Sequence, residues 1–109
     1  MADTFKVLAQ SNPSAATLTD IYTVPASTST TISTIVVCNR SSVATSFRIS
    51  VQVANAADDN KQYLYYDVII PGKDTFVCTL GLTLATTDVI AIYATLATLS
   101  FNIFGVEIA

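Results

Sequence analysis

The chain has 109 residues, of which 51% are hydrophobic and 12% are charged, and it contains no histidine. This length predicts a single domain spanning residues 1–109, with a core that needs neither a structural metal nor a disulfide framework. Five basic and eight acidic side chains give a net charge of −3. Because they form no basic stripe, we expect neither nucleic acid nor an anionic membrane as a partner.

Predicted β-strands dominate the chain, because β-branched and aromatic residues recur in it with a period of two. The expected strands are, in chain order, Phe5–Ala9, Leu18–Val24, Ile32–Asn39, Thr45–Val53, Gln62–Ile70, Thr75–Leu80, Asp88–Thr95 and Leu99–Ile108. Turn residues separate them, and no helical pattern intervenes. About eight strands at this spacing predict an all-β fold, a single antiparallel β-sandwich or jelly roll.

The N-terminal segment is a candidate for contacts with a neighbouring molecule. Residues 1–12 are expected to form an extended arm, of which Ala2–Asn12 could add a strand to a neighbour, and Phe5 and Val7 are interface candidates. Further along, the Ser/Thr tract 26–31 has no bulky residue and is expected to be a loop or an exposed strand edge.

Three strands carry more specific expectations. The continuously apolar centre of Ile32–Asn39 predicts a strand covered on both faces. The alternation in Thr45–Val53 predicts that Phe47, Ile49, Val51 and Val53 face the core, opposite Ser46, Arg48, Ser50 and Gln52. The short connection 96–98 predicts a hairpin joining the last two strands, and the shift of apolar phase beside Gly105 predicts a β-bulge in the last strand.

The two cysteines, Cys38 and Cys78, lie in apolar strands. The simpler interpretation is that both are buried free thiols that pack as small hydrophobic side chains. A bridge between neighbouring strands or subunits is the alternative, and the sequence does not decide between them.

Side chains for catalysis are scarce, and we expect no enzyme activity, no catalytic residues and no cofactor. Ser-His-Asp and Cys-His chemistry both need a histidine, and the chain has none. The acids are too scattered to suggest the paired carboxylates of a glycosidase.

The one acidic cluster is Asp58-Asp59-Asn60. Its oxygen atoms could contribute to a calcium site, but the spacing of a calcium loop is absent, so a solvated loop tip without metal is favoured. Three other acids, Asp20, Asp67 and Asp88, begin or interrupt strands and are expected to bond turn amides or to pair with an arginine, Arg40 or Arg48.

The run Tyr63-Leu64-Tyr65-Tyr66 is the most suggestive binding feature. Strand alternation places Tyr63 and Tyr65 on one face, and Tyr66 with Leu64 on the other. If the Leu64 face points inward, Tyr66 belongs to the core, and Tyr63 and Tyr65 lie at the surface. Core packing, a subunit interface and a glycan platform that also uses Asp58 and Asp59 all remain open.

Six segments, taken together in this order, carry a family resemblance. They are Leu18–Ala26 (LTDIYTVPA), Ile35–Arg40 (IVVCNR), Ser46–Ile49 (SFRI), Lys61–Asp67 (KQYLYYD), Leu84–Ile90 (LATTDVI) and Leu99–Ile108 (LSFNIFGVEI). From about Phe5 to Ile108 the chain resembles a group of small virion structural proteins of tailed bacteriophages. The resemblance implies a non-enzymatic role as a decoration, tail or fibre-associated protein.

Three functions follow as hypotheses. The first is a capsid decoration or cement protein, a homo-oligomer that binds the major capsid protein in many copies. The second is a baseplate or fibre-associated tail protein, and the third is a carbohydrate-binding module for a host-surface glycan. The chain has neither the roughly 20 apolar residues of a membrane helix nor the features of a secretory signal. We therefore expect a virion protein assembled in the host cytoplasm.

Overall fold

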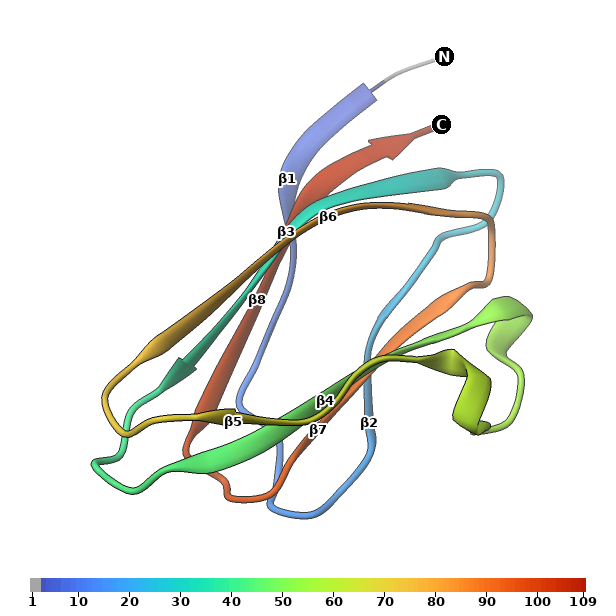
Figure 1. Ribbon diagram of the computed structural model, residues 1–109. Helices are drawn as coiled ribbons and strands as arrows, with labels where there is room; N and C mark the ends of the chain where they lie inside the picture. Colours follow the sequence, from blue (N-terminus) through green and yellow to red (C-terminus); the bar gives the residue numbers. More distant parts are fainter. Residues whose placement is uncertain (1–2) are drawn as a thin grey trace.

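The computed structural model describes residues 3–109, which form eight strands and two short 3₁₀ turns. The strands are β1 (Asp3–Ser11), β2 (Thr19–Thr23), β3 (Ser29–Asn39), β4 (Thr45–Gln52), β5 (Tyr63–Ile70), β6 (Thr75–Leu84), β7 (Val89–Ala94) and β8 (Leu99–Ile108), and the turns are η1 (Val53–Asn55) and η2 (Asn60–Gln62). They build two antiparallel four-stranded sheets packed as a sandwich, which confirms the predicted fold class (Figure 1).

The strand order is that of a jelly roll. Sheet A has the order β1-β8-β3-β6 and sheet B the order β2-β7-β4-β5. The first strand thus pairs with the eighth, the second with the seventh, the third with the sixth and the fourth with the fifth, as in one long hairpin rolled onto itself. This is the double-sheet arrangement expected for eight strands in two Greek keys.

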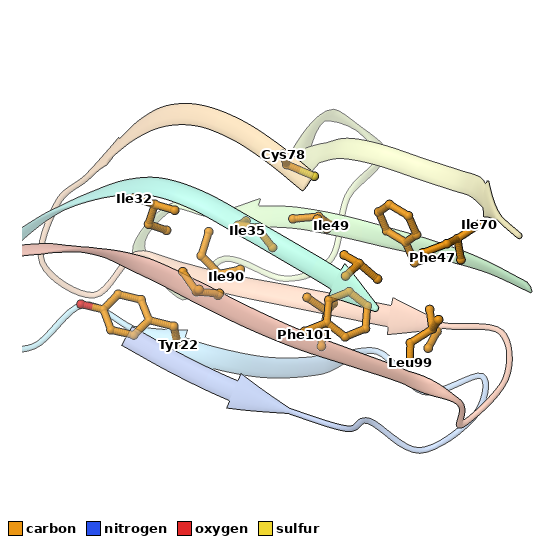
Figure 2. Packing of buried hydrophobic residues seen from close by; sticks show 14 of the residues in the cluster. Tyr22, Ile32, Ile35, Phe47, Ile49, Ile70, Cys78, Ile90, Leu99 and Phe101 are labelled. Carbon is orange, nitrogen blue, oxygen red and sulfur yellow. The ribbon is translucent and has the colours of Figure 1, made fainter. Parts of the chain in front are cut away.

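The core lies between the inner faces of the two sheets (Figure 2). Its largest fully buried side chains are Phe47 from sheet B and Phe101 from sheet A, whose ring centres lie 6.2 Å apart. Isoleucine and valine residues from β3, β4, β7 and β8 fill the remaining space. Alternation predicts the inward direction of Phe47 and Ile49 correctly, whereas Val53 falls in η1 and is 66% exposed.

The connection between β7 and β8 is not a hairpin, so that prediction is wrong. It carries the chain from sheet B to sheet A: the Thr95 amide still donates to Ser46 in β4, and Leu99 already pairs with Asn39 in β3. A short loop allowed either outcome. Crossing between the sheets lets Leu99 and Phe101 enter the core from the opposite side to β7.

The bulge predicted in the last strand belongs to its neighbours. β8 alternates without interruption, and the unpaired residues lie in its neighbours. Leu8 in β1 falls between the partners of Ile103 and Phe104, and Ser33 in β3 falls between the partners of Phe104 and Gly105. Gly105 is required there because an added Cβ would lie 2.2 Å from the carbonyl oxygen of Thr31. Because β8 is regular, the apolar residues up to Ile103 lie on the inner face of sheet A, and those after Ile103 lie on its outer face.

Three strands are longer than predicted, and β1 extends the expected Phe5–Ala9 to Asp3–Ser11. β3 begins at Ser29, within the tract expected to be a loop or strand edge, and β6 continues through Gly81 to Leu84. The expectation that β3 is covered on both faces is wrong in the single chain. Ile35 and Val37 are buried against sheet B, but Val36 on the opposite face is only partly covered.

The two cysteines are free and lie on opposite faces of sheet A. Cys78 pairs with Ile35 and is 2% exposed, whereas Cys38 pairs with Thr75 on the outer face and is half-buried. The register separates them by three residues, so they form no bridge within the chain. The expectation that both thiols are buried holds only for Cys78.

Candidate binding surfaces

The outer face of sheet A carries an exposed apolar patch. Because β8 alternates throughout, Phe101 and Ile103 point inward and the even-numbered residues point outward. The register places Phe5 of β1 opposite Val106 and Val7 opposite Phe104. We call these residues, together with Ile108, the apolar patch; it consists of Phe5, Val7, Phe104, Val106 and Ile108.

The members of the apolar patch at the β1 edge are the most exposed. Phe5 is 78% exposed, Val7 is 48% exposed and Phe104 is 36% exposed. The interface candidates Phe5 and Val7 thus lie at the surface as predicted. β1 is nevertheless paired along its length with β8 of the same chain, so the described part of the predicted arm is an edge strand of sheet A.

The rest of this outer face is almost free of charge. On β3 and β6, Val36 lies opposite Val77, which is 58% exposed, and Thr34 lies opposite both Phe104 and Thr79. Among the described strand residues of sheet A, Asp3 at the beginning of β1 is the only charged side chain in an outward register position. A broad neutral face with exposed aromatic and aliphatic side chains has the composition of the central part of a protein interface.

The outer face of sheet B has the opposite character and is organised around Arg48. Its guanidinium carbon lies 4.1 Å from the ring centre of Tyr66 and 4.3 Å from that of Tyr93. Arg48 also donates to both carboxylate oxygens of Asp67, at 2.6 and 3.3 Å, which raises the pKa of the guanidinium. The pairing predicted between Asp67 and an arginine is confirmed. These contacts are partly solvated, so each stabilises the fold by about 1 kcal/mol or less.

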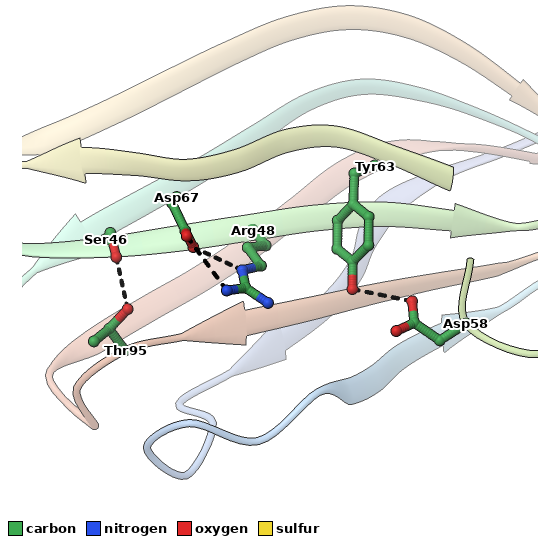
Figure 3. Close-up of polar contacts among 6 residues, drawn as sticks. All are labelled: Ser46, Arg48, Asp58, Tyr63, Asp67 and Thr95. Atoms are coloured by element: carbon green, nitrogen blue, oxygen red, sulfur yellow. Dashed lines mark hydrogen bonds and ion pairs between the residues drawn. The ribbon is translucent and has the colours of Figure 1, made fainter. Parts of the chain in front are cut away.

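Tyr63 lies beside this cluster (Figure 3). Its hydroxyl donates to the Asp58 carboxylate at 3.0 Å, and its ring meets Tyr66 edge to face, with 5.0 Å between ring centres. Partial burial and the neighbouring Asp58 together raise the pKa of Tyr63. Asn60, Tyr63 and Tyr66 line a shallow depression of about 480 Å³.

The predicted arrangement of the tyrosines is wrong because β5 carries two register irregularities. Relative to β4, β5 contains one extra residue at Leu64 and another in the region of Asp67, where φ is +52°. Tyr63 and Tyr66 consequently share the outer face, and Tyr66 is 56% exposed. Tyr65 turns inward and packs against Phe76, with 5.7 Å between ring centres, so it belongs to the edge of the core.

The two acidic candidates have local structural roles. Asp59 caps η2: its side chain accepts from the Lys61 amide, while the Gln62 side chain accepts from the Asp59 amide. Asp58 accepts from Tyr63. Within residues 3–109 no three His, Cys, Asp or Glu side chains converge as a metal site. The structure of the same residues contains no helix that is both long and apolar enough to cross a bilayer.

Sequence reasoning missed Phe104 and Tyr93 as surface residues. The only signal for Phe104 was the change of apolar phase in the last strand, which we attributed to a bulge in that strand. Tyr93 lies beside the outward-facing Arg48 in the β4–β7 register, and no sequence pattern identifies that pairing in advance.

Comparisons with family models, with curated proteins and with solved structures each returned no match. The resemblance to virion structural proteins of tailed bacteriophages therefore stays a prediction from the sequence, and the fold and the two outer faces are what the structure adds.

Proposed function

We propose that this chain is a non-enzymatic structural protein of a bacteriophage particle, a decoration or cement protein that binds the head lattice in many copies. The observation that carries the proposal is the neutral outer face of sheet A, where Phe5 is 78% and Phe104 36% exposed. The resemblance described above is the reason for assigning the chain to a bacteriophage particle. The jelly roll is compatible with this role, since viral capsid domains use it, but a fold alone does not assign a function.

The mechanism is burial of apolar surface. Fully burying an exposed Phe or Val side chain in a contact stabilises that contact by about 1.5–3 kcal/mol. The loss of translational and rotational freedom opposes this gain, so one copy held by a few such side chains binds weakly. When many copies engage a repeating lattice or one another, the combined attachment becomes strong. The uncovered edge of β1 offers a further contact by strand addition.

Two alternatives remain as hypotheses. A tail baseplate or fibre-associated protein would use the same outer face of sheet A in fewer copies. A carbohydrate-binding module would use the depression beside Asn60, Tyr63 and Tyr66, and jelly rolls also occur among lectins. Against the module, one face of the Tyr66 ring already carries the Arg48 guanidinium. Stacking a sugar there would compete with that contact.

The test is to purify phage particles from a lysate of cells producing this chain and to label them with antibody against it. Gold over the heads, with a high copy number by quantitative mass spectrometry, is the expected result. Label confined to tail ends at low copy number would replace the head assignment by the tail alternative. Unlabelled particles with free antigen in solution would overturn the virion assignment, and loss of glycan binding in Tyr66→Ala would then favour the module.

A further inference from the structure

We propose that two copies of this chain pack face to face through the outer faces of their A sheets. This inference rests on the proposed assembly role, and it identifies the occupant of the apolar patch as a second copy of the chain. In a two-fold contact the same surface is used by both subunits, so the patch would pack against its own counterpart.

The distribution of charge favours a second copy as the occupant. The chain has a net charge of −3, so two copies repel wherever their acids approach. Of the eight acids, Asp3 alone lies on this outer face, at its corner, and Glu107 points inward. The other acids lie on sheet B or in the connections between strands: Asp20, Asp58, Asp59, Asp67, Asp74 and Asp88. The outer face of sheet A is thus the broad surface on which two copies meet without opposing like charges. A strongly charged partner would find no complementary groups there.

The size of the face is sufficient for a stable contact. The molecule measures 45 × 28 × 19 Å. Even a face 45 Å long and only 19 Å wide covers about 850 Å², close to the area of about 800 Å² per partner that a standard stable interface buries. Phe5 and Phe104 supply aromatic side chains of the kind enriched in interfaces, and threonines of β3 and β6 supply small, neutral surroundings.

Sedimentation velocity over a range of protein concentrations tests the inference. Wild type should form a dimer, and Phe104→Lys and Thr34→Lys should each raise its dissociation constant by at least about tenfold. Both residues lie on interior strands of sheet A, so a contact along the β1 edge would be insensitive to them. The matched control is Ile69→Lys on β5 of sheet B, where the side chain is 74% exposed. It should leave the dimer intact, and circular dichroism verifies that every variant is folded.

The remaining outcomes separate this inference from the proposed function. A wild type that stays monomeric up to roughly 100 μM, far above the dissociation constants of stable complexes, overturns the face-to-face contact. If that monomer still labels the phage heads, the virion role survives and the apolar patch binds another protein. A dimer that Ile69→Lys disrupts and Phe104→Lys preserves would place the contact on sheet B and also overturn the inference.

Discussion

Replacing Phe47 by alanine tests whether the two sheets share one core. The Phe47 side chain is fully buried, and its ring centre lies 5.4 Å from that of Phe76 and 6.2 Å from those of both Tyr65 and Phe101. It therefore contacts aromatic residues from both sheets. Its removal would leave a cavity at the centre of the sandwich.

The expected loss in free energy of unfolding is large. Truncating a buried phenylalanine to alanine costs about 3–5 kcal/mol, and aromatic pairs in this geometry contribute beyond their buried area. With three aromatic neighbours, we expect Phe47→Ala to fall in the upper half of that range. A domain of this length has a total stability of about 5–15 kcal/mol, so the variant should fold with a melting temperature lowered by roughly 15–35 °C.

The assay is urea denaturation followed by tyrosine fluorescence, which is suitable because the chain has five tyrosines and no tryptophan. Phe104→Ala is the matched control: the same atoms are removed from a partly exposed position, and at dilute protein concentration the cost should stay below about 1 kcal/mol. If Phe47→Ala proves too unstable to measure, Phe47→Leu should still cost about 1–2 kcal/mol. A loss below about 1 kcal/mol for Phe47→Ala would refute the assignment of this strand face to the core.

Three further predictions concern sites outside the centre of the core. Hydrogen bonds from Lys6 at 2.7 Å and Tyr22 at 2.6 Å lower the pKa of Glu107, so Glu107 should stabilise the fold above its unfolded-state pKa and lose that effect as the pH falls through its folded value. Glu107→Gln should therefore cost about 1–2 kcal/mol in urea titrations at neutral pH, and this cost should shrink as the pH falls through the lowered folded-state pKa of Glu107; a pH-independent difference would contradict the ionic role. Gly105→Ala should cost about 1–3 kcal/mol by the same titration, because the added methyl group meets the Thr31 carbonyl, and an unchanged midpoint would show that the neighbouring strand yields freely. In dilute native protein Cys38 should react with a thiol reagent, whereas Cys78, whose pKa is raised by burial, should react only after unfolding; equal rates at the two thiols would contradict their placement on opposite faces.

The existence of all eight strands could be predicted from sequence, but the way they pair could not. The period of two follows directly from strand geometry, so the predicted strands Thr45–Val53 and Leu99–Ile108 agree with β4 and β8 to within one residue. Pairing depends on which inner faces fit together. The loop 96–98 was short enough for a hairpin, and only the packing of Phe101 opposite Phe47 shows why it crosses between the sheets.

Local irregularities also limited the prediction of the surfaces. Alternation assigns residues to faces only while the register is unbroken, and the two irregularities of β5 move Tyr65 inward and Tyr66 outward. Asp67 adopts a positive φ, which aspartate tolerates better than most residues, but nothing in the sequence requires it there. For β8 we expected a bulge that the strand does not have. The strand is regular, and the change of apolar phase marks an exposed patch.

The contrast between the two outer faces explains why assembly through sheet A is the stronger hypothesis. On sheet B the exposed groups around Arg48 already have partners, since Arg48 lies against Tyr66 and Tyr93 and pairs with Asp67. A ligand there would first have to displace contacts that the chain makes with itself. On sheet A the patch around Phe5 and Phe104 has no such partners within residues 3–109, and its apolar area gains stability only when another surface covers it. A single added positive charge should therefore weaken assembly most at the centre of sheet A and leave the fold intact. A charge at a buried structural position would instead unfold the chain.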